Sequence, residues 1–392
     1  MNLAWLWDVM MMLKRAVSHP CTRADTLIPE GGEVVAFDGC LRHHVFPSAH
    51  LTSIRNVRGI TFVKLEATET SRAPFQIQDF RGDFTEVAAL IQASWEENGK
   101  QGLLYTPEFL TSCLTYPGSS YSLAPTLYHA EKPCAFVAGF PRTIRYKRRE
   151  LRVILCTLLS VSSEYKKSGY GVVLWSELVK RAQSAGYDGM VNYCVEGEPM
   201  NGMILGCCRM MKLPTERIFS VHYLMRLLYP KRGAAHDDDS EDHLVEKFRR
   251  AAGLIGNDPP LTRIWTEKEM QWQLQRHDGL VAHHRSGDKE GLLTAYLMHA
   301  ANAQRTKCLL IEDVLWGMLE NGDRLTLVER LLDRGIQAGA QMAFLPCLGY
   351  ADIAPFRAAR FRSSARTLHC YLTVFNGQPA REPVSSMYLD VI

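Results

Sequence analysis

The spacing of apolar and polar positions becomes regular after residue 74. Residues 75–80 (FQIQDF) alternate as a short strand does. Asp83 then precedes an amphipathic pattern, which predicts a capped helix that begins at Phe84. Three strands follow, the last of them almost continuously apolar as in a strand covered on both faces: Pro125–His129, Ala135–Phe140 and Leu151–Val161.

The pattern then predicts helix, strand, helix and strand, at 172–185, Met190–Val195, about 199–212 and Ile218–Leu228. This element order, β-α-β-β-β-α-β-α-β, indicates an α/β fold. After a polar and mostly charged stretch the order begins again, with elements at Leu280–His284, Leu292–His299, Cys308–Leu315, Leu325–Gln337, Met342–Leu345, 351–359 and Leu368–Phe375.

A duplicated domain would explain this recurrence. Leu178–Asp188 and Leu331–Gln341 are offset by 153 residues and are identical at four of eleven positions. We therefore expect four parts: an N-terminal extension at 1–73, a first domain at 74–230, an acidic linker at 231–243 and a second domain at 244–392.

Composition narrows the class of protein. The 392 residues are 46% hydrophobic and 22% charged, which excludes disorder, collagen and coiled coil as the main class. A net charge of +3 gives no global field for nucleic acid. The eleven cysteines are irregularly spaced and form no CxxC, which favours reduced thiols. The adjacent pair His43–His44 has no second cluster to support it, so we expect no metal site.

The N-terminal apolar run does not resemble a membrane span or a secretory signal. It is interrupted by Asp8 and ends at Lys14–Arg15, so it is too short to cross a bilayer. A secretory signal carries its positive charge before the apolar core rather than after it. We therefore expect a cytoplasmic protein without a membrane span.

A candidate phosphate-binding loop lies at 159–171 (LSVSSEYKKSGYG). A buried strand leads into glycines at the start of a helix, where backbone N–H groups and the helix dipole favour a pyrophosphate. A dinucleotide fingerprint would need glycine where Leu174 stands, and no Gly-Lys-Ser/Thr of a Walker loop is present.

Residues 166–171 (KKSGYG) resemble the acyl-CoA motif Arg/Gln-x-x-Gly-x-Gly/Ala of the GCN5-related N-acetyltransferase (GNAT) family, with Lys166 in place of Arg or Gln. The resemblance extends over about 75–228. It implies two GNAT-like α/β domains, each a mixed, mostly antiparallel sheet flanked by helices, and acetyl-CoA or another acyl-CoA as co-substrate. The cofactor-binding residues that it implies are Leu159, Val161, Ser162, Lys166, Lys167, Ser168, Gly169, Tyr170, Gly171 and Asn201.

The second domain lacks this motif. At the offset of 153, Gly169 corresponds to Gly322, but Gly171 corresponds to Arg324, whose side chain would occupy the place of phosphate oxygens. We therefore expect a degenerate second GNAT-like domain. Tandem arrangements of this kind are known in N-myristoyltransferases and mycothiol synthase.

Candidates for proton transfer follow the fifth strand of the first domain. Glu196 and Glu198 are the candidate bases, although Glu198 could instead cap the next helix. Tyr193 is a candidate acid, and Cys208 stands where the family has its acidic tyrosine; both could instead be core residues. By resemblance to N-myristoyltransferases, the terminal carboxylate of Ile392 is a further candidate base.

The segment Arg142–Arg152 carries six cations in eleven residues and predicts an exposed basic hairpin. It could be a solvated turn, a contact for the CoA 3′-phosphate, or a docking site for an acidic acyl carrier protein. Aromatic interleaving is limited to Tyr146, so nucleic acid is a less favoured partner.

Three functions are therefore open. The first is N-acyl transfer from acyl-CoA to the amine of a small molecule, by direct attack in a ternary complex. The second is transfer of a long acyl chain from an acyl carrier protein. The third is non-catalytic binding of acyl-CoA by a sensor or scaffold.

Overall fold

The computed structural model describes residues 34–36, 49–57, 60–67, 75–96, 103–166, 168–229, 243–256, 259–300, 305–377 and 383–391. Backbone contacts divide the chain into two units, Met1–Phe75 and Gln76–Ile392. In the first unit, β1 (Val34–Ala36), β2 (Ala49–Val57) and β3 (Ile60–Ala67) form an antiparallel sheet in the order β1-β3-β2. The N-terminal apolar run and the pair His43–His44 lie outside the described residues.

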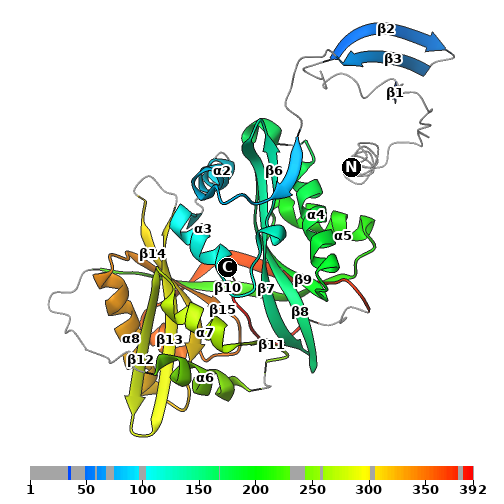
Figure 1. Ribbon diagram of the computed structural model, residues 1–392. Coiled ribbons are helices and arrows are strands. Elements are labelled where there is room, and N and C mark those ends of the chain that lie inside the picture. The colour runs from blue at the N-terminus through cyan, green and yellow to red at the C-terminus, as the bar shows by residue number, and fades with distance from the viewer. Residues whose placement is uncertain are drawn as a thin grey trace. The chain divides into compact units, whose positions relative to one another are not determined.

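The second unit is built on one 14-stranded sheet (Figure 1). Its strands are β4 (Gln76–Asp79), β5 (Leu103–Leu104), β6 (Pro125–His129), β7 (Lys132–Tyr146), β8 (Arg149–Val161), β9 (Gly189–Val195), β10 (Thr215–Leu227), β11 (Leu261–Ile264), β12 (Gly279–Ser286), β13 (Lys289–Ala300), β14 (Lys307–Leu315), β15 (Met342–Cys347), β16 (Arg362–Val374) and β17 (Met387–Tyr388). Its helices are α2 (Phe84–Glu96), α3 (Pro107–Leu114), α4 (Tyr170–Ser184), α5 (Pro199–Met210), α6 (Leu244–Ile255), α7 (Glu267–Gln275), α8 (Asn321–Gln337) and α9 (Ala354–Ala358).

The two halves of this sheet have matching strand orders when each is read from its own outer edge toward the centre. The order is β4-β6-β7-β8-β9-β16-β10-β15-β14-β13-β12, and the pairs β8–β9 and β14–β15 are parallel. The neighbours β10 and β16 are exchanged: β16 inserts beside β9, and β10 inserts beside β15. A pseudo-two-fold relation therefore passes between them, and most other pairings are antiparallel. The predicted α/β class, with a mixed sheet flanked by helices, is confirmed.

Every strand and helix predicted after residue 74 is present, but several elements were not predicted. These are β5, α3, α6, β11, α7 and β17. The helix α3 has only eight residues, too few to display an apolar period, although Thr106 caps it and Pro107 begins it. Residues 231–242 lie outside the described residues, and the exchange of β10 and β16 joins the halves in one sheet. The proposed domain boundaries therefore remain a prediction.

Among the described residues, no helix combines the length and apolar character needed to cross a membrane. The apolar interior instead lies along the sheet. One core cluster packs α2 and α3 against β7 and β8, and includes Phe136, Ile144 and Leu155. Another packs α8 and α9 against the strands of the second half, and includes Leu331 and Phe356.

Candidate active site

A wedge opens between β8 and β9. Their parallel pairing ends at Cys156 and Asn192. Beyond that point β8 stays paired with β7 as far as Val161, and β9 stays paired with β16 as far as Val195. Because each strand follows a different neighbour, the edge of β8 that faces β9 leaves the ladder over its last residues and presents its backbone N–H and C=O groups to the wedge.

A β-bulge lies in the same part of β8. Thr157 pairs with Ala138 and Ser160 pairs with Phe136, so β8 has one residue more than β7 across this interval. Leu158, which is buried, adopts a left-handed backbone with φ of 62°. Such a conformation is costly for a branched side chain and is maintained only where the surroundings impose it. Bulges of this kind re-aim the strand beside functional sites.

The start of α4 lies against the end of β8. Gly169, the residue before the helix, has φ of 85°, which favours glycine. Because glycine has no side chain, this residue supplies no side-chain cap to the first-turn N–H groups of α4. A Cβ at Gly171 would lie 3.5 Å from Val161 Cγ2 and 3.8 Å from Met203 Sδ. The second glycine therefore lies beside the end of β8.

Polar and aromatic side chains surround this loop. Lys166 Nζ lies 3.5 Å from the carbonyl oxygen of Ser94 in α2, whereas Lys167 lies outside the described residues. His129 Nδ1 and Tyr165 Oη are 3.0 Å apart, and the ring of Tyr165 meets that of Tyr170 edge-on. His129 comes from β6, and no local sequence signal identified it.

The predicted candidates at the end of β9 are close in space. Glu196 Oε1 lies 3.6 Å from His369 Nε2, and His369 Nδ1 lies 3.1 Å from Ser220 Oγ. The Glu196 side chain is 63% exposed. Glu198 occupies the N-cap position of α5, but its side chain makes no capping hydrogen bond. Asn201 Nδ2 donates to the carbonyl oxygen of Val195 at 3.2 Å, which joins α5 to the end of β9.

The two candidate acids are buried. Burial raises the pKa of the Tyr193 phenol well above its usual value of 10. Cys208 Sγ lies 3.8 Å from Thr373 Oγ1, and burial raises the pKa of its thiol. Raised pKa values favour the protonated forms, which a proton donor needs. Their catalytic roles remain predictions.

The corresponding wedge of the second half is filled by the chain itself. The pairing of β14 with β15 ends at Leu310 and Phe344, and β14 has an extra residue at Glu312. The C-terminal residues 389–391 line the same small cavity as Leu310 and Glu312. Arg324 Nε donates to the carbonyl oxygen of Leu319 at 2.7 Å, just before α8. Both features match the expected degenerate domain, although the sequence did not predict the C-terminal segment. Ile392 lies outside the described residues.

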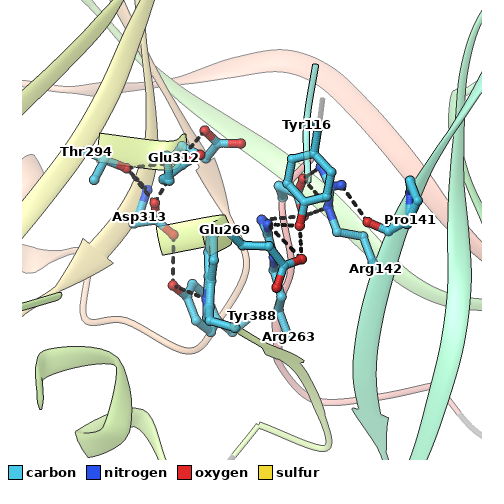
Figure 2. A network of polar contacts seen from close by, with 12 residues as sticks. Tyr116, Pro141, Arg142, Arg263, Glu269, Thr294, Glu312, Asp313 and Tyr388 are labelled. Atoms are coloured by element: carbon cyan, nitrogen blue, oxygen red, sulfur yellow. Dashed lines mark hydrogen bonds and ion pairs between the residues drawn. The ribbon is translucent and has the colours of Figure 1, made fainter. Parts of the chain in front are cut away.

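A buried network of charges lies between the two halves (Figure 2). Arg142 forms an ion pair with Asp390, and Arg263 Nη1 lies 3.1 Å from the same carboxylate. Arg263 Nη2 donates to Tyr116 Oη at 2.7 Å, and Tyr116 donates to Glu269. These guanidinium groups help to hold the pKa of Asp390 at about 2, whereas burial raises the pKa of Glu269 to about 7.

The prediction of an exposed basic hairpin was therefore wrong at Arg142, which is 5% exposed. The β7–β8 turn at Lys147–Arg148 is exposed. It lies at the opposite end of β8 from α4, about 40 Å away for a 13-residue strand. That distance excludes the hairpin as a contact for a phosphate held at α4. The sequence missed this network because it joins residues as far apart as Arg142 and Asp390.

The described residues contain no cluster of three or more His, Cys, Asp or Glu side chains suited to a metal ion. All nine cysteines in the described part of the chain are free thiols, without a disulfide bond.

Comparison with known proteins gives no match to any family model and no match among curated proteins. Solved structures do match. N-myristoyltransferase from Saccharomyces cerevisiae, solved with bound myristoyl-CoA, is 14% identical with a TM-score of 0.59, over 78% of this chain and 84% of that chain. A GCN5-related N-acetyltransferase from Sphaerobacter thermophilus is 13% identical with a TM-score of 0.50, over 79% of this chain and 99% of that chain.

At such low identity the likeness concerns the fold. The protein has the GNAT fold, in a tandem arrangement consistent with that of N-myristoyltransferase. The resemblance expected from residues 166–171 is confirmed at this level.

Proposed function

We propose that the protein is an acyltransferase that moves an acyl group from acyl-CoA to the amine of an acceptor. The observation that carries this proposal is the wedge between β8 and β9, which leads to the glycine-bounded start of α4. The neighbouring structures support it, because one holds myristoyl-CoA and the other is named an N-acetyltransferase.

The residues fit the chemistry of CoA. The first-turn N–H groups of α4 and the helix dipole suit the pyrophosphate, and Lys166 adds a positive charge nearby. Ser162, Ser168 and Tyr170, which lie close to this turn in the sequence, are proposed to take part in the same binding. The freed edge of β8 from Leu159 to Val161 suits the amide groups of pantetheine. Asn201 holds α5 against the opposite wall of the wedge.

In the transfer, the neutral amine nitrogen attacks the thioester carbon. The C–N bond forms as the C–S bond breaks, the amine proton passes to a base, and the CoA thiolate takes up a proton. A backbone N–H near the bulge in β8 would stabilise the oxyanion. Glu196, beside His369, and Glu198 are the proposed bases. Tyr193 and Cys208 are the proposed acids.

The acceptor is proposed to be a small-molecule amine, and the protein is proposed to act in the cytoplasm. The long-chain alternative is supported by the likeness to a structure with bound myristoyl-CoA. An acyl carrier protein could dock only on the exposed part of the basic hairpin, at 147–150, because Arg142 is buried. A non-catalytic sensor would bind acyl-CoA at the same wedge without turnover.

A thermal-shift panel with CoA, acetyl-CoA and myristoyl-CoA tests this proposal. A ligand at 100 times its Kd adds about 2.7 kcal/mol to the free energy of unfolding. We expect the wild type to be stabilised and Gly171→Arg to melt normally without any shift. Gly253→Arg is the matched control, because a Cβ at Gly253, an exposed helical glycine, would meet nothing within 4 Å.

If none of the three ligands raises the melting temperature of the wild type, the proposal is wrong. Release of free CoA thiol in the presence of amines then separates an enzyme from a sensor. In that assay Glu196→Gln or Glu198→Gln should lower turnover while the thermal shift is kept. If neither does so, the base lies elsewhere.

A further inference from the structure

A cavity of about 960 Å³ opens beside α2, α3 and α7, three helices on one side of the sheet (Figure 1). The start of α2 contributes Asp83 and Glu86, the outer face of α3 contributes Glu108, and the end of α7 contributes Trp272 and Arg276. We refer to this cavity as the acidic groove. Its volume is sufficient for a small-molecule ligand.

The acidic groove adjoins the bulge of β8. Trp272 and Arg276 line the groove and also line a second, small cavity. Thr157 and Leu158, the residues of the bulge, form another part of that small cavity. Trp272 and Arg276 therefore lie between the groove and the small cavity beside the bulge. Trp272 Nε1 donates to the carbonyl oxygen of Ser112 at 3.2 Å, which fixes the indole against α3.

The charge of the groove favours a cation. Local hydrogen bonds to its own backbone and to Thr106 lower the pKa of Glu108, so this carboxylate is ionised at neutral pH. Asp83 accepts a hydrogen bond from Tyr128 Oη at 3.0 Å. The one arginine of the lining, Arg276, is already paired with Glu312 at 3.2 Å. The lining therefore carries the three carboxylates of Asp83, Glu86 and Glu108 against this one arginine, which is already paired.

Arg276 gives a second indication of a ligand, because one of its donor atoms lacks an acceptor. Its guanidinium lies 3.9 Å from the centroid of the Tyr296 ring, and the residue is 7% exposed. Its Nε is buried and has no hydrogen-bond partner among the described residues. A buried donor without an acceptor is costly, so a ligand oxygen at this point would be favourable. The acidic groove therefore combines excess negative charge with a lining arginine whose Nε has no acceptor among the described residues.

We propose that the acidic groove binds the acceptor, and that this acceptor is an amine that carries a carbonyl group on the carbon next to the reacting nitrogen and a second, positively charged amine farther along its chain. The reacting amine passes Trp272 to the bulge, the oxygen accepts from Arg276 Nε, and the second ammonium remains beside Glu86 and Glu108. This inference rests on the proposed acyl transfer, because the bulge is the site of attack only if acyl-CoA occupies the wedge.

Three simple amines separate the parts of this proposal. Lysinamide carries both charges and the carbonyl, norleucinamide lacks the second charge, and 1,5-diaminopentane lacks the carbonyl. Their binding to the CoA-loaded protein is measured by calorimetry, and their KM by thiol release. Two partly exposed ion pairs are worth about tenfold in affinity. We expect lysinamide to bind about tenfold more tightly than norleucinamide and more tightly than 1,5-diaminopentane.

The attraction between the second ammonium and the two glutamates is tested by the double variant Glu86→Gln/Glu108→Gln. It should abolish the preference for lysinamide over norleucinamide and leave the CoA thermal shift unchanged. The matched control is Glu150→Gln/Glu246→Gln, which removes two exposed carboxylates outside the groove and should keep the preference. Since Glu86 and Glu108 also stabilise helix N-termini, the melting temperature of each variant is recorded alongside.

Equal binding of lysinamide and norleucinamide by the wild type, or a preference that survives in the double variant, overturns the role of the carboxylates. Equal binding of lysinamide and 1,5-diaminopentane overturns the role of Arg276 Nε. In these cases the CoA thermal shift persists and acyl transfer stands. A wild type without any CoA shift overturns acyl transfer itself, whereas lysinamide binding to the CoA-free protein still reports on the groove.

Discussion

At the scale of single residues, Asp390 is the acidic partner of two buried arginines. Its carboxylate neutralises two guanidinium groups, from Arg142 on β7 and Arg263 on β11, and all three side chains are at most 4% exposed. Buried charges are tolerated only in such pairs, because an unpaired ion in the interior loses its hydration without compensation. Asp390 thereby ties the C-terminal segment to both halves of the sheet.

Asp390→Asn should therefore lower the free energy of unfolding by about 3–5 kcal/mol, because it leaves buried guanidinium charge uncompensated. Urea denaturation monitored by circular dichroism measures the change. Glu267→Gln is the control, since its pair with Arg249 is exposed and should contribute less than about 1 kcal/mol. Equal effects of the two substitutions would mean that the buried ion pairs contribute no more to the free energy of unfolding than an exposed one.

Glu269 makes stability depend on pH in the opposite direction from a carboxylate whose pKa is lowered by an ion pair. Burial raises its pKa to about 7 in the folded protein, from an ordinary value of 4.5. Between these pH values the folded state binds more protons than the unfolded state, so this group makes the protein less stable as pH rises from 4.5 to 7. The shift corresponds to roughly 3 kcal/mol.

Glu269→Gln mimics the protonated carboxyl and should remove most of this dependence. We expect the variant to gain stability over the wild type above pH 7 and to match it near pH 4.5. Denaturation midpoints measured at pH 4.5, 6 and 8 provide the comparison. A constant difference between the two proteins at all three pH values would show that Glu269 does not titrate in this range.

At the scale of elements, β8 decides where chemistry can occur. Its apolar run makes it a central strand between β7 and β9, yet its last residues leave β9 and bulge at Leu158. A strand that loses one neighbour exposes backbone groups, which a buried chain ordinarily avoids. The backbone groups exposed where β8 leaves β9 therefore need hydrogen-bond partners from a ligand or from another segment of the chain. In the first half the start of α4 adjoins the opening, and in the second half residues 389–391 fill it.

At the scale of the whole molecule, the exchange of β10 and β16 makes the two halves depend on each other. Without β16, β9 and β10 would face a gap as wide as a full strand, since adjacent strands lie about 4.8 Å apart. Without β10, β15 and β16 would face the same gap. Neither half can then complete its sheet, and the C-terminal residues of the second half also supply Asp390 to Arg142 of the first.

We therefore expect residues 76–230 expressed alone to show no cooperative thermal transition, and residues 76–230 co-expressed with 231–392 to regain one. The break lies in 230–242 and cuts none of the described elements. Calorimetry of each fragment and of the reassembled pair measures this. A sharp transition of 76–230 on its own would show that the exchange is not required for folding.

The sequence by itself determined what depends on neighbours in the chain. The period of Leu151–Val161, the glycines at 169 and 171 and the order of the elements were enough for the α/β class and the GNAT fold. These signals are local, because backbone conformation and one-sided burial act over a few residues. The same argument predicted the repeat at an offset of 153 residues, which the mirrored sheet order matches.

Only the tertiary structure decided which distant residues meet. Asp390 reaches Arg142 across 248 positions, and Tyr116 reaches Glu269 across 153. A basic run looked exposed in the sequence because charge is usually solvated, yet its first arginine is buried by a partner from the other end of the chain. The acidic groove likewise draws its lining from α2, α3 and α7. Such pairings follow from the packing of the whole sheet, and no periodicity along the chain records them.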